Sequence, residues 1–145
     1  MKTLFTSFLI VGFLFFSNAQ SSVKFVDNSL ADEVLGFTDS GLHDVSVKFV
    51  KSEKQADFTV YLSKVRNEQD FTVERFANVD RTIRVKYSGS SDFRYLIKST
   101  GNADINIHVS KNPNSGVYIS SYDPLNEEEI ISIIHQDILK FLNNN

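Results

Sequence analysis

An aspartate recurs every 10 to 13 residues through the middle of the chain, and each time it ends a short polar run. The segment that follows then alternates apolar and polar residues, as where Phe58, Val60 and Leu62 follow Asp57. Alternation with period two is typical of a β-strand with one buried face. A regular period of this length sets the whole fold, so the chain is predicted to repeat one short strand unit. The recurring residues are Asp32, Asp44, Asp57, Asp70, Asp80, Asp92 and Asp104.

The predicted fold class is mainly β, with about nine short strands in a ~12-residue repeat followed by one C-terminal α-helix. After Asp70 the alternation breaks at Arg75, which suggests a bulge. In the next unit Ile83, Val85 and Tyr87 are expected to point inward. The strands are expected near 23–26, 33–37, 45–50, 58–63, 71–76, 82–87, 93–98, 105–110 and 117–121.

The recurring aspartates are interpreted as structural. A carboxylate at a strand start can accept hydrogen bonds from backbone N–H groups one or two residues further along, which fixes the turn. A ladder of calcium ligands is the alternative interpretation. Calcium loops, however, need several oxygen ligands within a few residues and usually a glycine, whereas this repeat supplies one aspartate per unit.

The end of the chain changes to helical periodicity. Asn126 and Glu129 form a predicted capping box, and a helix over 126–142 is expected to follow. Its apolar arc is broad, so it must dock on another surface. The open face or an end of its own sheet is the expected surface, and a partner protein is the alternative. The arc consists of Ile130, Ile131, Ile133, Ile134, Ile138, Leu139 and Phe141 or Leu142.

The first residues have the pattern of a secretory signal peptide. Lys2 is basic, 4–16 is an apolar run, and small residues precede a predicted cleavage after Ala19. No later segment is apolar enough to span a membrane, and the chain has no cysteine. The predicted organisation is therefore a signal peptide at 1–19, a β-repeat domain at 20–125 and a helix at 126–142 packed on the same domain. The expected location is secreted or periplasmic.

The sequence singles out no catalytic, cofactor-binding or metal-ligating residue. His43, His108 and His135 lie in a turn, on the polar face of a strand and in the helix, and none shares metal-ligand spacing with another. No nucleophile elbow or phosphate loop is present, so no cofactor and no enzymatic activity are expected. The net charge of −3 gives no reason to expect nucleic acid as a partner. The side chains that could stack on sugars, or simply belong to the sheets, are Tyr61, Tyr95 and Tyr118.

The stretch VKFVKSEKQADFTVYLSKVRNEQDFTV, residues 47–73, resembles the septoil knot domain family of small secreted bacterial proteins. The family repeat has alternating apolar residues, a Lys-rich linker and Ala-Asp, and 47–57 matches it closely. The resemblance implies a β-rich domain whose chain winds into a seven-crossing torus knot. It implies no activity, cofactor or catalytic residue.

Two functions follow as hypotheses. The first is a non-catalytic secreted or periplasmic protein, acting as a structural or interaction module with an unknown protein or envelope component. The second is a β-barrel that binds a small apolar ligand. Strand pairing separates the two architectures, because an up-and-down barrel pairs sequence neighbours antiparallel. A wound repeat instead pairs strands from non-consecutive units and leaves no interior cavity.

Overall fold

The structure, a computed structural model, describes residues 20–65 and 70–145. The predicted signal peptide lies outside these residues. Nine strands are present in the described part, all at the predicted places, which confirms the mainly β fold. They are β1 (Ser21–Phe25), β2 (Glu33–Thr38), β3 (Val45–Phe49), β4 (Phe58–Ser63), β5 (Phe71–Val73), β6 (Arg81–Lys86), β7 (Phe93–Ile97), β8 (Ile105–Ser110) and β9 (Val117–Ser120).

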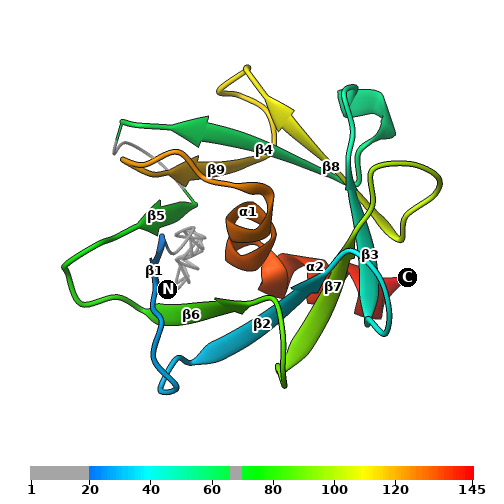
Figure 1. Cartoon of the computed structure of the whole chain (residues 1–145). Coiled ribbons are helices and arrows are strands. Elements are labelled where there is room, and N and C mark those ends of the chain that lie inside the picture. Colours follow the sequence, from blue (N-terminus) through cyan, green and yellow to red (C-terminus); the bar gives the residue numbers. More distant parts are fainter. Residues whose placement is uncertain (1–19, 66–69) are drawn as a thin grey trace, which may run out of the picture.

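The strands close into a barrel in which every neighbour is parallel and none is a sequence neighbour (Figure 1). Each pair joins strands that are four or five apart in order, such as β1 with β5 and β6. Around the ring the order is β1-β6-β2-β7-β3-β8-β4-β9-β5, so the chain advances two places at each step and passes around twice. A closed barrel is therefore present, but the up-and-down pairing weighed from the sequence is wrong, and the pairing of non-consecutive units is confirmed.

The barrel is strongly staggered. β3 pairs with β7 through Val45–Val47 and with β8 through Val47–Phe49, so each half of the strand has a different partner. The other strands of five or six residues also pair with one neighbour through their first half and with the other neighbour through their second half. Each of these pairings covers three or four residues. Such stagger tilts the strands steeply around the axis, which lets short connections carry the chain back for the next parallel strand.

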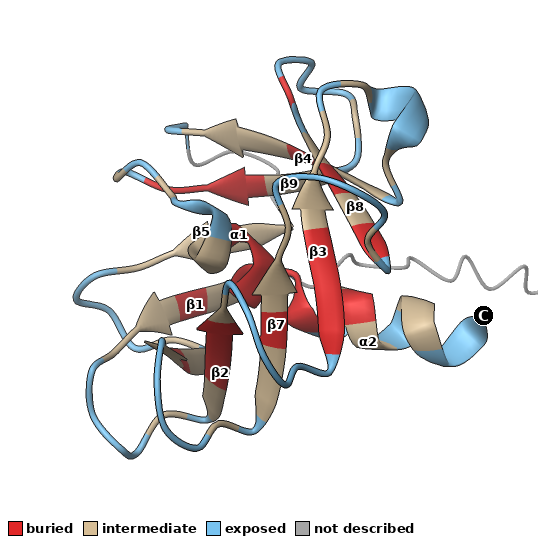
Figure 2. Ribbon diagram, turned by 45° about the vertical axis from the view of Figure 1, so that its right-hand side comes forward, coloured by how far each residue is buried: buried red, intermediate tan, exposed pale blue. Residues whose placement is uncertain are grey.

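The alternation seen in the sequence corresponds to the inside and outside of this barrel. The central inward residue of each long strand is fully buried, as Val47, Val60 and Ile83 are, while most residues at strand ends are half-buried (Figure 2). Two residues of the alternating apolar pattern are more exposed than this pattern predicts; one follows Asp80 and the other follows Asp104. Tyr87 lies beyond the end of β6 and is 67% exposed, and Val109 near the end of β8 is 38% exposed. The predicted bulge at Arg75 is also wrong, because β5 simply ends at Val73.

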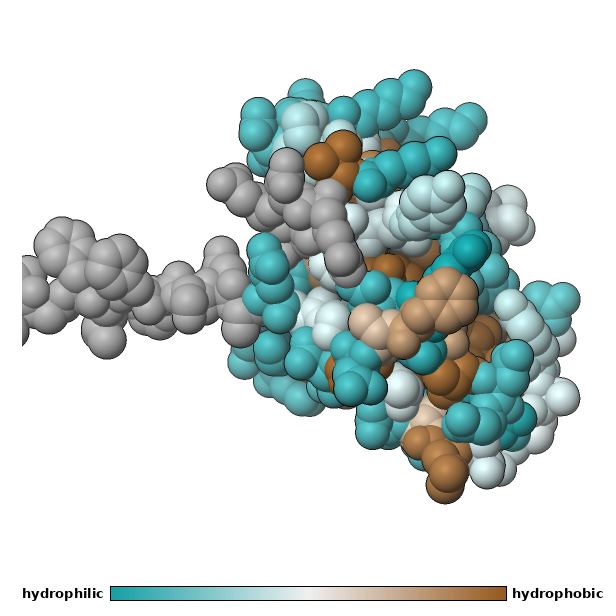
Figure 3. All heavy atoms as spheres, turned by 90° about the vertical axis from the view of Figure 1, so that its left-hand side faces the viewer, coloured by the Kyte–Doolittle hydropathy of each residue, from teal (hydrophilic) through white to brown (hydrophobic). Residues whose placement is uncertain are grey.

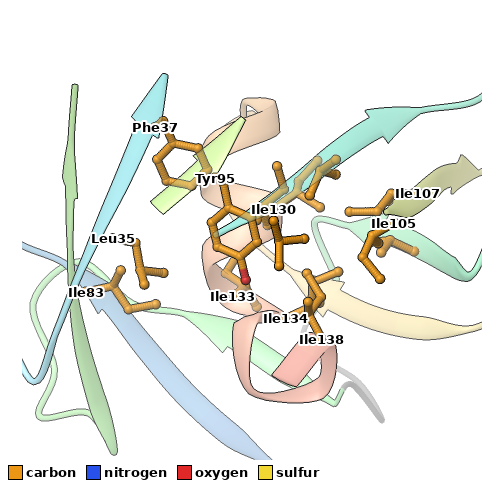
Figure 4. Packing of buried hydrophobic residues seen from close by; sticks show 14 of the residues in the cluster. Leu35, Phe37, Ile83, Tyr95, Ile105, Ile107, Ile130, Ile133, Ile134 and Ile138 are labelled. Carbon is orange, nitrogen blue, oxygen red and sulfur yellow. The ribbon is translucent and has the colours of Figure 1, made fainter. Parts of the chain in front are cut away.

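The C-terminal segment lies inside the barrel, rather than on a face or end of the sheet. Figure 1 shows α1 (Glu127–Ile133) end-on within the ring, and α2 (His135–Asn144) continues from it. A helix surrounded by strands must be apolar on all sides, which explains the broad arc in the sequence. Its buried residues meet strand residues such as Leu35, Tyr95 and Ile107 (Figure 4); they are Ile130, Ile131, Ile133, Ile134 and Ile138.

The predicted single helix is two helices, with the break at Ile134. The predicted capping box is present: the Asn126 side chain accepts from the N–H of Glu129, whose carboxylate accepts from the N–H of Asn126. At the break, the Arg81 guanidinium donates to the carbonyl oxygen of Ile133 at 2.7 Å. Because helix ends leave carbonyls without partners, this side chain stabilises an end of α1 that the sequence pattern alone does not show.

Candidate functional site

The parallel barrel has two different openings. All strands begin at one end, here called the N-terminal mouth, and end at the other, here called the C-terminal mouth. The helical segment enters at the C-terminal mouth with Asn126 and leaves at the N-terminal mouth with α2. In parallel α/β folds, ligands bind outside the carboxyl ends of the strands. In this barrel the carboxyl ends of the strands surround the C-terminal mouth.

At the N-terminal mouth the seven recurring aspartates link the two turns of the barrel. Each carboxylate accepts, at 2.7–2.8 Å, from the backbone N–H of the second residue of a strand 48 to 58 residues away. Most of the aspartates also donate their own N–H to the carbonyl oxygen of that same residue. The partners, in the order of the aspartates, are Thr82, Arg94, Asn106, Tyr118, Ser22, Val34 and Ser46.

In three of these pairs the partner is a serine or threonine, and its hydroxyl donates a second hydrogen bond to the carboxylate. The hydroxyl of Ser46 donates to Asp104 at 2.7 Å and accepts from the Asp104 N–H at 3.0 Å. The backbone N–H and then the hydroxyl of the partner hold the pKa of Asp104 below its usual range, and they do the same for Asp32 and Asp80. These carboxylates are therefore stabilised in their ionised form.

The aspartate carboxylates accept hydrogen bonds from backbone N–H groups, as predicted, but the residues that donate these bonds differ from the predicted ones. The predicted acceptor bond was to a backbone N–H one or two residues further along. The observed N–H belongs to the other turn of the barrel, because the neighbouring strand edge comes from a distant unit. Before β9 the equivalent position is Gly116 at φ +69°, where a Cβ would lie 1.9 Å from the carbonyl oxygen of Thr59. No aspartate fits there.

Where α1 ends, a buried polar cluster fills the N-terminal mouth. The guanidinium of Arg81 lies 3.5 Å from the carboxylate of Glu33, and both side chains are about 85% buried. The Gln136 amide donates to the same Glu33 oxygen at 2.6 Å. Since Arg81 also bonds the end of α1, this cluster fixes the helix to β2 and β6. Two buried atoms of the cluster, Oε2 of Glu33 and Nε of Arg81, have no hydrogen-bond partner among the described residues.

Next to the cluster, His135 and Tyr95 share a buried hydrogen bond of 2.7 Å between Nδ1 and the phenol oxygen. Both side chains are almost fully buried. Burial lowers the pKa of the His135 imidazole and raises the pKa of the Tyr95 phenol, so both stay neutral at physiological pH. Phe93 packs on the imidazole with ring centroids 5.1 Å apart. The pair is enclosed by the core and has no open side for a substrate.

The C-terminal mouth contains a groove of about 960 Å³ between the barrel wall and the start of α1. Its floor is apolar and comes from β3, β4, β8 and the approach to the helix. The volume lies in the range of small-ligand pockets. The floor consists of Phe49, Leu62, Val109, Leu125 and Ile130.

Charged side chains stand on both sides of this groove. Lys51 and Lys111 follow the ends of β3 and β8 on the barrel side, and Glu127 and Glu128 stand on the helix side. None of the four side chains forms a hydrogen bond or ion pair with another residue in 20–65 or 70–145. Partial burial and the neighbouring Glu128 raise the pKa of Glu127. The groove therefore holds unpaired charges of both signs around an apolar floor.

Sequence reasoning missed this groove. Its floor residues read as ordinary inward positions of strands, and only their place at a strand end exposes them. Of the histidines and tyrosines it did weigh, one lines the groove and the others lie elsewhere. His108 lines the groove and contacts the Val50 carbonyl oxygen at 3.0 Å, while His43 lies at the surface with the Gly41 carbonyl. Tyr61 and Tyr118 pack on each other, with ring centroids 4.9 Å apart.

Across the described parts of the chain, no group of three or more His, Asp or Glu side chains is placed to hold a metal ion. Among the same residues, no helix is long and apolar enough to cross a membrane. No protein-family model, curated protein or solved structure matches the chain. The groove and its charges are therefore the basis for a functional assignment.

Proposed function

We propose that the protein is a non-catalytic module of the bacterial cell envelope, secreted or periplasmic, that binds a partner through the groove at the C-terminal mouth. The groove carries this proposal because its floor is apolar and its four charged side chains have no hydrogen-bond or ion-pair partner among the residues that the structure describes. The aspartates of the N-terminal mouth, in contrast, are bonded to backbone N–H groups of neighbouring strands. The predicted leader at 1–19 supports export.

A small apolar ligand is the second candidate. The closed barrel favours it in general, but α1 occupies the barrel interior, where its isoleucines pack against inward residues of the strands. The groove is the place where such a ligand would bind, and its volume of about 960 Å³ suits one.

Site-specific photo-crosslinking tests the proposal. A benzophenone side chain at Val109, inside the groove, is expected to capture a partner in the intact cell envelope. The same group at Leu30, which is 86% exposed and lies in the β1–β2 loop, serves as the matched control. Capture that is equal at both positions, or absent at Val109, would contradict a binding function of the groove.

We also propose that the chain is related to the septoil knot domain family. The double winding of parallel strands supports this relation, together with the Lys-rich linker and Ala-Asp of 47–57. A knotted path would make folding slow, on the order of seconds or longer, since distant segments must meet first. Refolding from denaturant in a single millisecond phase would count against it.

A further inference from the structure

The two kinds of charge at the groove come from different elements of the fold. The lysines belong to the barrel side, after β3 and β8, and the glutamates belong to the first turn of α1. They do not pair with each other in the structure; Lys51 and Lys111 are exposed to solvent, whereas Glu127 is partly desolvated. Charges left unpaired in such a place favour a ligand that brings the opposite charges with it.

The arrangement also restricts how those ligand charges are placed. A fatty acid carries one charge, which leaves one side of the groove unpaired. A zwitterionic phospholipid carries both of its charges at one end of its apolar chains, whereas the two kinds of charge at the groove stand on two different elements, the barrel wall and α1. A short peptide has an ammonium at one end, a carboxylate at the other and apolar side chains between them, which matches the groove.

We infer that the groove binds a short apolar peptide with free termini, whose carboxylate faces Lys51 and Lys111 and whose ammonium faces Glu127 and Glu128. This inference rests on the proposed binding function of the same groove. The apolar side chains of the peptide pack on Phe49 and Leu62. Partial burial of Glu127, which raises its pKa, also fits an ammonium partner, because a bound cation stabilises the ionised carboxylate.

The free tripeptide Leu-Leu-Leu is the probe, and isothermal titration calorimetry on the purified protein is the measurement. The N-acetylated, C-amidated tripeptide has the same apolar body without the charges. We expect it to bind about tenfold more weakly, since two exposed charge pairs together contribute about this much. Equal binding of the free and blocked tripeptides would overturn the inference.

Charge-matched variants locate each terminus. Glu127→Gln with Glu128→Gln should weaken binding of the free tripeptide and leave an N-acetylated tripeptide unaffected. Lys51→Gln with Lys111→Gln should weaken the free tripeptide and leave a C-amidated one unaffected. The controls are Glu53→Gln and Lys54→Gln on the adjacent 3₁₀ helix (Glu53–Gln55), which is exposed and does not line the groove. Variants that bind like the controls would contradict the assignment.

Palmitate and phosphatidylethanolamine vesicles are the competing ligands. Binding of either to the groove without binding of the tripeptide overturns the peptide assignment. Photo-capture at Val109 without tripeptide binding does the same, while it keeps the groove as a binding site. Absence of capture at Val109 removes the proposed function as well, so the two failures are distinguishable.

Discussion

The two mouths of the barrel use similar residues in opposite ways. At the N-terminal mouth, aspartates, Arg81 and Glu33 are bonded to backbone groups or to one another. At the C-terminal mouth, four charged side chains surround an apolar groove and form no hydrogen bond or ion pair with any other described residue; they are Lys51, Lys111, Glu127 and Glu128. A polar group that is fully bonded is best explained by structure, whereas an unpaired charge beside exposed apolar surface points to binding.

The surface around the C-terminal mouth also exposes aromatic side chains. Phe76, Tyr87 and Tyr122 all follow strand ends, of β5, β6 and β9, and are 91%, 67% and 80% exposed. Arg75 lies over the Tyr122 ring and forms an ion pair with Asp123. Figure 3 shows hydrophobic atoms reaching the surface among hydrophilic ones on the side of the molecule where β1 and β5 lie. Leu30 and Leu42, in the loops that lead into β2 and β3, are exposed as well, so exposed apolar side chains are not confined to the residues after strand ends.

Removing residues 126–145 is expected to have the largest effect, because the helices join the two mouths through the core. Five isoleucines of this segment are buried, and each contributes about 1.5–3 kcal/mol when fully buried. That total is comparable with the ~5–15 kcal/mol stability of a domain. The truncated chain should be unfolded by circular dichroism. Removal of Asn143–Asn145 alone, which are exposed, is the control and should leave the melting temperature nearly unchanged.

A truncated chain that stays folded at the same melting temperature would show that α1 is not needed in the barrel. The broad apolar arc would then have to bind a partner or a membrane surface instead.

Arginine substitutions compare the two mouths directly. Arg81→Met removes the bond to Ile133 and leaves the carboxylate of Glu33 buried without its charge partner, which should cost about 3–5 kcal/mol. Arg75→Met breaks an exposed ion pair with Asp123 at the other mouth and should cost about 0–1 kcal/mol. Urea unfolding of both variants measures the difference. Equal losses would contradict the view that only the N-terminal mouth is structural.

Much of the strand pattern could be predicted because period-two alternation is a local signal that burial inside a barrel preserves. All nine strands were found this way, including the irregular unit after Asp70. The partners of the aspartates could not be predicted, since Asp104 bonds Ser46, a residue 58 positions away, and no local pattern encodes that register. The order of the strands in the barrel decides which residue each aspartate bonds.

The helix break and the groove escaped prediction for related reasons. The chain bends at Ile134 where Arg81 from β6 bonds the end of α1, so the cause lies in another segment. Leu62 and Val109 alternate like any core residue, and their exposure depends on where the steep tilt of the strands places the barrel mouth. The unpaired lysines look like ordinary surface residues in the sequence.

The aspartate bonds are expected to have a moderate individual effect. Asp104→Ala removes the acceptor of the Ser46 N–H and hydroxyl and should cost about 1–2 kcal/mol, while Asp104→Asn should retain part of this. Asp27→Ala, at an exposed position outside the repeat, is the matched control. Thermal melting with added calcium completes the test. A large calcium-dependent rise in melting temperature, abolished in Asp104→Asn, would restore the calcium interpretation.

The smallest expected effect concerns the pH dependence of the free energy of unfolding, which should have opposite signs for titrating groups at the two mouths. Hydrogen bonds lower the pKa of Asp32, Asp80 and Asp104 below 3.8, so their contribution is present above that pH and is lost as pH falls through the lowered values. Burial raises the pKa of Glu127 above 4.5, so the folded state loses stability as pH rises from 4.5 through the raised pKa.

Glu127→Gln should therefore stabilise the protein at neutral pH by a fraction of about 1 kcal/mol, since the carboxylate is largely solvated. This gain should shrink as pH falls and vanish at about pH 3, where the carboxyl is almost fully protonated in both states. Urea unfolding at the two pH values measures it. A gain that persists in acid, or a loss at neutral pH, would mean that Glu127 is paired and that the C-terminal mouth resembles the N-terminal one.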